Sequence, residues 1–510
     1  AQGRMRSASR VACASLQASP PTPAVRTLRW VLRSGGAARS LRSVAEHHRS
    51  LARPWGSAAG RAASLGLAAT AGDTGRSMLD LAKGHPDAAL LPRGVLAEAC
   101  TSAAAEFAGG SSEGLQYGSK PQGSAAFLSE LATFLGRRCP GEAPARVDGL
   151  LLTGGVSHGL DLACSVLTKP GDAILVEAPT YFLAVGIFAS RGLEVVPVAT
   201  DGEGLIVEAV EAALDARPPG SAPVRLLYTV PTSHNPTGTT LPSARRRALV
   251  DLARQRGFLV LADEVYHLLD WHPHGERPPR LACFDEAYTG VAPGRGSSLD
   301  PAVSMAGGDE EEDAAYCFEA SRSSPAEATK AEVAEVAAVD PVVVSVSSFT
   351  KILAPGLRVG WIEAAPALVT RLAATGYLTS GGCVATFTAD AVLRHVLRSG
   401  DADRVLEGLA AEYAQRARRL VVALEGAGLA PLVLPCGGYF IWVPLGADAR
   451  AVLEVAKAKH GVSFMPGDVC DISGNPALAR AARLCFAHLS AEELEEAAPR
   501  LAAAALEVAA

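Results

Sequence analysis

The chain has 510 residues, which by length alone allows roughly three domains. Hydrophobic residues make up 49% of it, enough to bury a large core, and no apolar run approaches the ~20 residues that a membrane helix needs. The net charge is −6 at pH 7, and an acidic body argues against nucleic-acid binding. The ten cysteines form no CxxC pair and no Cys/His cluster with zinc spacing, which predicts reduced thiols and no metal site.

Residues 1–72 differ in composition from the rest of the chain. They hold eleven arginines, no lysine and a single acid, Glu46. A leader rich in arginine, serine and alanine and poor in acids is typical of an organellar transit peptide, and a disordered basic tail is the alternative. We therefore expect a protein of the mitochondrion or the plastid, from which this leader is removed.

An N-terminal arm and part of a small domain are expected over residues 73–114. Folded sequence is expected to begin near Met78, with an apolar run that Gly and Pro interrupt, which favours an extended arm with turns. Apolar spacing then predicts helices at 95–107 and 123–135.

From Val147 onward, short apolar runs alternate with amphipathic segments. This alternation predicts βαβ units and an α/β large domain over residues 115–385, with a mostly parallel sheet flanked by helices. The predicted strands are 149–153, 173–176, 194–198, 224–230, 258–263 and the run that starts at Val342 and ends before Lys351. The predicted helices between them are 160–167, 181–190, 206–214 and 243–256.

Residues 272–340 interrupt the alternation. They are rich in Pro, Gly and Ser, and they include an acidic run at 309–313 and an alanine- and glutamate-rich piece at 326–339. We expect an insertion that is mostly solvated loop, with one helix near its end, rather than a regulatory docking segment.

A smaller α+β domain is predicted for residues 386–510, after a helix at 366–373. Its expected strands are 439–443, 462–465 and 482–486, and its expected helices are 389–397, 402–426 and 491–506.

Polar residues follow several predicted strands of the large domain at their carboxyl ends. Asn235, Asp263, Lys351 and the loop 154–159 all take such positions. Ligands bind at that edge of a parallel sheet, so these residues can converge on one crevice.

Lys351 follows an apolar run that ends in small hydroxyl residues. A lysine at the mouth of such a strand is costly unless it is paired, neutral or covalently used, and a carbonyl cofactor requires an unprotonated amine. The alternative is a strand-end lysine that reaches solvent. A pyridoxal phosphate (PLP) site would need this amine, an anion cradle, a carboxylate facing the pyridine nitrogen, donors to the phenolic oxygen and an aromatic ring.

Each of these groups has a candidate in the chain. The Gly-rich loop 154–159 lies between a strand and a helix, where backbone N–H groups meet a phosphate, although such turns are often merely structural. Asp263 ends an apolar run and would pair with a pyridinium, or else cap the segment that follows. Tyr266 would donate to a ring oxygen or be a core aromatic, and Asn235 lies in a turn where Asn and Pro are ordinary.

Eight short motifs follow one another along the chain. They are Tyr117-Gly118 with Gly123, the turn 153–160, Ala178-Pro179-Thr180-Tyr181, Asn235-Pro236-Thr237-Gly238, Ala262-Asp263-Glu264-Val265-Tyr266, Ser348-Phe349-Thr350-Lys351, Gly356-Leu357-Arg358-Val359-Gly360 and Arg483-Leu484-Cys485-Phe486. In order and spacing they resemble class I/II aminotransferases of PLP fold type I, most closely the aminoadipate/kynurenine type. The resemblance covers about 79–510 apart from the insertion.

The resemblance implies a PLP cofactor and a role for each motif residue. Lys351 would hold the cofactor as a Schiff base and then move the substrate proton. Asp263 would bind the pyridinium, and Tyr181 would stack on the ring. Tyr266 and Asn235 would donate to the phenolic oxygen.

A phosphate site and a dimer are implied in the same way. The backbone amides of Val156 and Ser157 would hold the phosphate, together with the side chains of Ser348 and Arg358. Tyr117 would reach the phosphate of the neighbouring subunit, which implies a homodimer. The residues from position 156 depart from the Ser-Gln-Gln of the most similar relatives, so backbone contacts carry this assignment.

The implied reaction is ping-pong transamination between an α-amino acid and a 2-oxo acid, with 2-oxoglutarate as the expected acceptor. Arg483 would clamp the α-carboxylate in bidentate fashion, with Gly84 and Asn235 beside it. The alternatives are a PLP-dependent β-lyase on the same scaffold and a non-catalytic PLP-binding regulator, which the leader does not favour. Aromatic, aminoadipate-like and branched donors all stay open.

Overall fold

The computed structural model of the chain describes residues 78–272, 277–290 and 339–510. The expected leader, the acidic run at 309–313 and almost all of the expected helix near the end of the insertion lie outside these residues.

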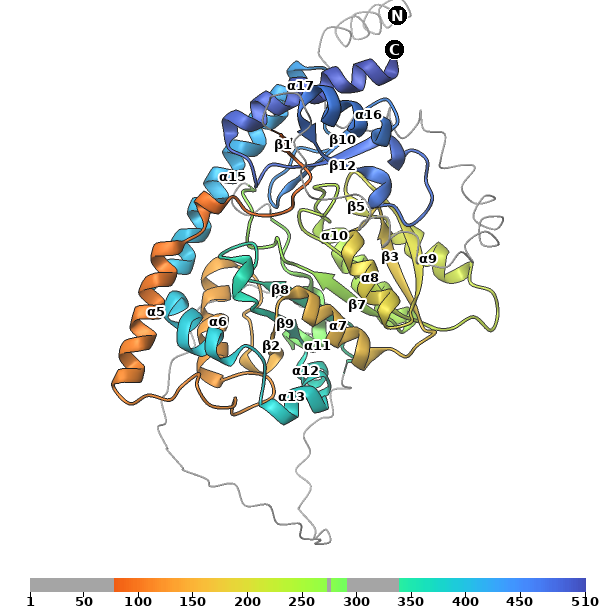
Figure 1. Ribbon diagram of the computed structural model, residues 1–510. Coiled ribbons are helices and arrows are strands. Elements are labelled where there is room, and N and C mark those ends of the chain that lie inside the picture. The colour runs from red at the N-terminus through yellow and green to blue at the C-terminus, as the bar shows by residue number, and fades with distance from the viewer. Residues whose placement is uncertain (1–77, 273–276, 291–338) are drawn as a thin grey trace, which may run out of the picture.

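An eight-stranded sheet forms the centre of the large domain, in the strand order β2-β9-β8-β7-β6-β3-β4-β5 (Figure 1). The four central pairs, from β4 through β3, β6 and β7 to β8, are parallel. Strand β9 is antiparallel to both of its neighbours, and β5 is antiparallel to β4. The mostly parallel α/β sheet is thus confirmed, and β5 and β9 are additional strands. The bounds are β2 (Leu150–Thr153), β3 (Ala173–Ala178), β4 (Glu194–Asp201), β5 (Gly204–Leu205), β6 (Val224–Thr229), β7 (Leu259–Asp263), β8 (Val343–Ser348) and β9 (Gly360–Ala364).

Successive side chains of the central strands pack into two different apolar layers. In β6, Leu226 and Tyr228 belong to one layer and Leu227 to the other. The first layer includes α6 (Ala125–Arg138), α7 (Val156–Leu167) and α8 (Phe182–Ser190), and the second includes α9 (Val207–Asp215) and α10 (Ser243–Arg256). Helices cover both faces, which is why these strands read as continuous apolar runs rather than as alternating ones.

The small domain joins the two ends of the described chain. Strand β1 (Leu79–Asp80) pairs in parallel with β11 (Val462–Ser463). An antiparallel sheet has the order β10-β13-β12, with β10 at Phe440–Pro444, β13 at Ala481–Cys485 and β12 at Met465–Pro466. The single strand expected at 462–465 is therefore two short strands in two different sheets.

Helices α15 (Asp401–Gly426), α16 (Ala449–Val455) and α17 (Ala491–Ala509) complete the small domain, beside its strands in Figure 1. The helix expected at 389–397 is a π-helix, η5, that continues directly into α14. The remaining helices are η1 (Ala88–Leu90), α5 (Arg93–Ala108), η2 (Val147–Gly149), η3 (Leu281–Phe284), α11 (Glu286–Thr289), η4 (Pro355–Leu357), α12 (Pro366–Ala373), α13 (Gly376–Gly381), η5 (Phe387–Leu393), α14 (Arg394–Arg398), η6 (Ala456–His460), η7 (Gly467–Val469) and η8 (Leu478–Arg480).

The expected insertion at 272–340 is narrower in the structure. Residues 277–290 form η3 and α11, and Leu281 and Tyr288 are buried in the core. The carboxylate of Asp285 accepts hydrogen bonds from the amides of Val342 and Val343, at 2.9 and 3.0 Å, where β8 begins. This side chain thereby ties together the two ends of the chain that flank residues 291–338. The composition did not indicate that residues 277–290 are folded, because their apolar residues are interspersed with Pro and Arg.

Within the described residues, no helix combines the length and the apolar character needed to cross a membrane. The eight cysteines of this part of the chain are all free thiols.

Candidate active site

The carboxyl ends of the parallel strands carry the predicted site residues, and the N-terminal arm lies against them. Asp263 is the last residue of β7, Lys351 follows β8, and Asn235 lies in the turn after β6. The arm reaches this edge because β1 pairs with the small domain, and its carbonyl groups at Ala82 and Gly84 contact site residues.

The amine of Lys351 lies inside this crevice. Its Nζ donates to the carbonyl oxygen of Gly84 at 2.8 Å and lies 4.7 Å from the centre of the Tyr439 ring. The Tyr439 hydroxyl donates to the Lys351 carbonyl oxygen at 3.2 Å, which fixes the backbone at this position. Burial lowers the pKa of Lys351 to about 8, although Cys485 and Asp263 act in the opposite direction. Roughly a tenth of this amine is therefore neutral at pH 7, far more than for an ordinary lysine, and the neutral form is the one that attacks a carbonyl.

Asp263 supplies a buried carboxylate at the same edge of the sheet. Burial raises the pKa of Asp263 to about 6, while a hydrogen bond from Tyr228 and the positive charge of Lys351 both lower it. The Tyr228 hydroxyl donates to Oδ2 of Asp263 at 3.0 Å, and both side chains are fully enclosed. A carboxylate so placed pairs readily with a cationic ring nitrogen.

Within the described part of the chain, Arg483 presents a guanidinium of which Nε has no hydrogen-bond partner and each terminal nitrogen makes only one hydrogen bond. Nη2 donates to the carbonyl oxygen of Ala82 at 2.6 Å, and Nη1 donates to Oδ1 of Asn235 at 3.2 Å. The guanidinium carbon lies 4.2 Å from the centre of the Phe440 ring. Its Nε is buried and has no hydrogen-bond partner among the described residues. A substrate carboxylate that accepts from Nε and from a free N–H of a terminal nitrogen would form the forked pair typical of guanidinium groups.

An anion cradle forms where β2 turns into α7. Val156 and Ser157 open this helix, where helix geometry leaves N–H groups without carbonyl partners. Arg358 donates from Nη2 to the carbonyl oxygen of Gly154 at 3.2 Å. Gly155 has a φ of 87°, and a Cβ there would lie 2.9 Å from Nη2 of Arg358. Glycine is thus required for the guanidinium to approach the turn.

Two side chains near the cradle are already engaged within the protein. The Ser348 hydroxyl donates to the carbonyl oxygen of Val359 at 2.9 Å and accepts from the amide of Thr350 at 3.0 Å. Nδ1 of His158 accepts from the amide of Gly154 at 2.9 Å. His158 therefore stabilises the turn itself, so the helix amides and Arg358 are the main candidate ligands for an anion.

The predicted aromatic residues differ in their surroundings. Burial raises the pKa of Tyr181 to about 12, and Asp263 adds to the rise, so its phenol stays protonated beside the carboxylate. Tyr266 is buried, and its ring lies edge-on to that of Phe440, with 6.2 Å between the ring centroids. Tyr117 lies in the loop before α6 and is 85% exposed, and Ser157 and Arg358 at the cradle are exposed as well.

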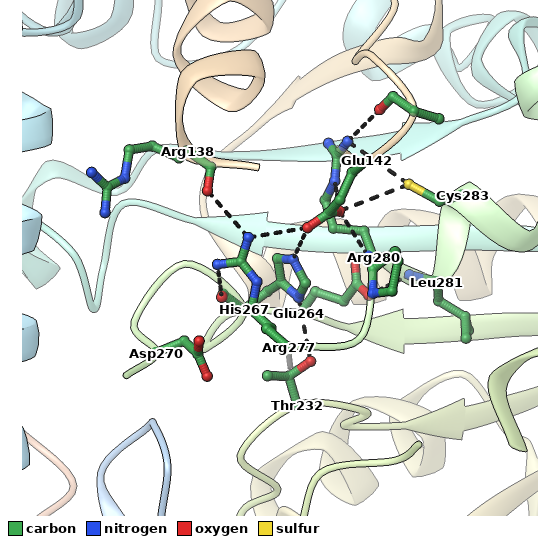
Figure 2. Close-up of polar contacts among 12 residues, drawn as sticks. Arg138, Glu142, Thr232, Glu264, His267, Asp270, Arg277, Arg280, Leu281 and Cys283 are labelled. Atoms are coloured by element: carbon green, nitrogen blue, oxygen red, sulfur yellow. Dashed lines mark hydrogen bonds and ion pairs between the residues drawn. The ribbon is translucent and has the colours of Figure 1, made fainter. Parts of the chain in front are cut away.

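The segment that carries Asp263 and Tyr266 also contributes His267 to a buried ion-pair cluster, which Figure 2 shows. We call it the Glu142 cluster, and it comprises Glu142, His267, Arg277, Arg280 and Glu363. The Glu142 carboxylate contacts His267 Nε2 at 3.0 Å, Arg280 Nε at 2.9 Å and Arg277 Nη2 at 3.1 Å, as Figure 2 shows. Arg280 also contacts Glu363 at 2.9 Å.

The Glu142 cluster fits an ion-pair network better than a metal centre. Ligand atoms of Cys139, Glu142 and His267 lie within 4.8 Å of one another. The oxygens of Glu142 are already engaged by two guanidinium groups, which would repel a cation. The cluster therefore anchors the segment behind the site.

Four residues of the site had no role assigned from the sequence: Tyr228, Tyr439, Phe440 and Cys485. Cys485 was recoverable, because it stands two residues after Arg483 on β13 and so shares its face. The other three depend on which strands become neighbours.

The residues at this edge fit PLP. Lys351 offers an amine whose pKa is lowered, and Asp263 offers a carboxylate for the ring nitrogen. Arg358 and the start of α7 together offer a cradle for the phosphate. The unused Nε of Arg483 is left for a substrate.

Comparisons with known proteins agree with this chemistry. The family described as aminotransferase class I and II matches residues 76–276 and 279–501. The chain is 28% identical to aromatic-amino-acid aminotransferase 1 of Thermococcus litoralis over 83% of this chain and 87% of the relative. It is also 28% identical to 2-aminoadipate transaminase of Thermus thermophilus, over 83% and 89% of the two chains.

Solved structures show the same arrangement. The kynurenine aminotransferase of Pyrococcus horikoshii, solved in complex with PMP, matches with a TM-score of 0.66 and 25% identity over 85% of this chain and 92% of that one. Because the family match covers far more than half of the chain, the protein belongs to the class I and II aminotransferases and is a PLP-dependent transaminase.

Proposed function

We propose that the protein transfers the amino group of an α-amino acid to 2-oxoglutarate, with both substrates using one crevice in turn. The observation that carries this proposal is the spacing of two contacts on the arm. Arg483 binds the carbonyl of Ala82, and Lys351 binds the carbonyl of Gly84, two residues further on. An amino acid that lies along this arm can place its carboxylate at Arg483 and its α-carbon near Lys351.

Each residue then has a definite task. Arg483 orients the α-carboxylate, and the neutral amine of Lys351 takes the proton from Cα and would deliver it to the carbonyl carbon that PLP supplies. Asp263 balances positive charge on the ring nitrogen. PLP, when bound, supplies the carbonyl group and the electron-withdrawing ring. The same groups serve both half-reactions, because amino donor and 2-oxo acceptor share an α-carboxylate.

The donor is best sought first among aromatic amino acids and 2-aminoadipate, which give two of the relatives their names. A screen of amino donors, with 2-oxoglutarate as acceptor and the cofactor absorbance bands as readout, tests the proposal. Lys351→Ala is the matched control and should show neither donor-dependent change nor turnover. Release of pyruvate and ammonia from a cysteine conjugate without an acceptor acid would instead identify a β-lyase.

The functional unit of the proposal is a homodimer. Four large apolar side chains are strongly exposed on the surface around the Tyr117 loop and its neighbours α13 and η5. The loop lies against the segment that follows α13, since a Cβ on Gly118 would be 2.5 Å from Sγ of Cys383. A second copy of the chain would cover this surface and bring Tyr117 toward the partner's cradle. Light scattering should give twice the mass of one chain, and a Tyr117→Ala variant should bind PLP more weakly. The four side chains are Leu115, Tyr117, Tyr377 and Phe387.

An organellar location remains part of the proposal on compositional grounds. Residues 1–72 hold eleven arginines and one acid. Fusion of this segment to a fluorescent reporter should direct the reporter to mitochondria or plastids, and a diffuse cytosolic signal would contradict the assignment.

A further inference from the structure

Tyr228 occupies a position that the reaction described so far does not use. It lies on β6 directly beside β7, where its register partner is Leu261, two residues before Asp263. From there its hydroxyl donates to Oδ2 of Asp263 at 3.0 Å. The side chain is completely buried, so water cannot take the place of this donor.

The position of the Tyr228 ring is itself held by packing. The Phe188 ring of α8 meets it edge-to-face, with centroids 5.2 Å apart and planes at 64°. Burial and the neighbouring Asp263 raise the pKa of Tyr228 well above its ordinary value, so the hydroxyl keeps its proton and acts as a donor. Strands β6 and β7 and helix α8 thus fix the Tyr228 hydroxyl in a position from which it donates to Asp263.

The two oxygens of Asp263 are unequally engaged. Oδ2 receives the Tyr228 hydroxyl at 3.0 Å, whereas Oδ1 receives only a long contact of 3.4 Å from the amide of Val265. One oxygen is therefore committed and the other is available to a ligand. Among the charges that act on this carboxylate, Lys351 favours the ionised form and Glu177 opposes it.

We propose that Tyr228 is a positioning residue for transamination: by holding one oxygen of Asp263, it keeps this carboxylate ionised and turned toward the pyridine nitrogen of the cofactor. The proposal rests on the assignment of Asp263 as the partner of that nitrogen. Burial, together with the charge of Glu177, raises the pKa of Asp263, and the hydrogen bond from Tyr228 is the largest influence that lowers it. Without the hydroxyl, the carboxylate should take up a proton at a higher pH and lose its pairing with the ring.

The test is Tyr228→Phe in the full PLP-loaded enzyme, with Tyr288→Phe as the matched control. Tyr288 is equally buried, and its hydroxyl also donates to a buried carboxylate, that of Glu363, but in the Glu142 cluster. Both variants lose a hydrogen bond to a buried acid, and Tyr288→Phe also removes an acceptor from the amide of Arg146 at 3.3 Å, so this control should lose at least as much thermal stability. Only the first should change the chemistry of the cofactor.

Three quantities decide the outcome: the pH profile of the amino-donor half-reaction, the pH titration of the cofactor absorbance, and the dissociation constant of PLP. For Tyr228→Phe we expect the acid limb of the rate profile to rise by about one pH unit, the half-reaction to slow by about tenfold to a hundredfold, and PLP to bind about tenfold more weakly. For Tyr288→Phe we expect wild-type values of all three.

Phe188→Leu provides a second variant, which keeps the hydroxyl and loosens the ring, and it should shift the acid limb in the same direction by less. It decides the matter if Tyr228→Phe does not fold. Wild-type profiles for Tyr228→Phe, or equal shifts in Tyr228→Phe and Tyr288→Phe, would overturn the proposal. A wild-type enzyme without any donor-dependent absorbance change would instead refute the transamination, and the PLP affinities of the variants would still report on Tyr228.

Discussion

Replacing Glu142 by glutamine should destabilise the protein by about 3–5 kcal/mol, the range observed when one partner of a buried ion pair is removed. The Glu142 carboxylate accepts hydrogen bonds from Arg280, from its amide and its Nε at 2.9 Å each, and from Arg277 at 3.1 Å. Glutamine keeps the shape but loses the charge, and its NH2 group would face guanidinium donors. Arg280 would retain Glu363, so the cost should fall within this range rather than exceed it.

The measurement is urea unfolding followed by tryptophan fluorescence, with Glu407→Gln as the control. Glu407 pairs with Arg138 at 2.8 Å, but its side chain is 66% exposed, and such surface pairs are worth at most about 1 kcal/mol. Burial would raise the pKa of Glu142, yet His267 and Arg280 outweigh it and lower the pKa. The stabilisation should therefore be present above the ordinary value of 4.5 and fade as the pH falls below it. A change of less than about 1 kcal/mol for Glu142→Gln, equal to that of the control, would refute this reasoning.

Three further predictions concern the site and its surroundings. Because burial lowers the pKa of Lys351 to about 8, PLP uptake by the cofactor-free chain should accelerate with rising pH and level off above about 8; a midpoint near 10.5 would show a fully solvated amine. Arg483→Ala should raise KM for every amino donor alike by about a hundredfold or more, since two charged hydrogen bonds are lost, and an effect on a single donor would mean that Arg483 reads a side chain. Replacement of residues 291–338 by a short Gly/Ser linker should leave the cofactor spectrum and turnover intact, because Asp285 already joins the flanking segments; loss of PLP binding would assign those residues a part in the site.

The sequence was sufficient for those parts of the fold in which local pattern and final environment agree. The strands that became β3, β6, β7 and β8 are buried on both faces, so their composition alone marks them. Strands β5 and β9 were missed for different reasons. β5 has only two residues, which is too short for a recognisable pattern. β9 begins at Gly360, directly after a turn, and its first residue was assigned to the motif that contains Arg358.

The site shows the same division between local and long-range information. Asp263 and Lys351 could be singled out because each is a charged group at the end of an apolar run. The contact between Arg483 and Asn235, far apart in the sequence, depends on how the small domain meets the sheet. Tyr228 could not be assigned either, since its role arises only once β6 and β7 are neighbours in the observed register. The Glu142 cluster forms only where three separate segments of the chain meet. The residue spacing within any one of these segments does not predict it.

The pairing of β1 with β11 has a consequence for how the protein is made. Leu79 leaves the ribosome long before its register partner Val462, and at about 5–20 residues per second the wait is roughly 20–80 s. During that time β1 has no strand to pair with, and the apolar side chains of Leu79 and Leu81, which are buried in the folded protein, stay exposed. The nascent chain should therefore engage a chaperone at its amino-terminal end, and release of that end should coincide with synthesis of the last tenth of the polypeptide.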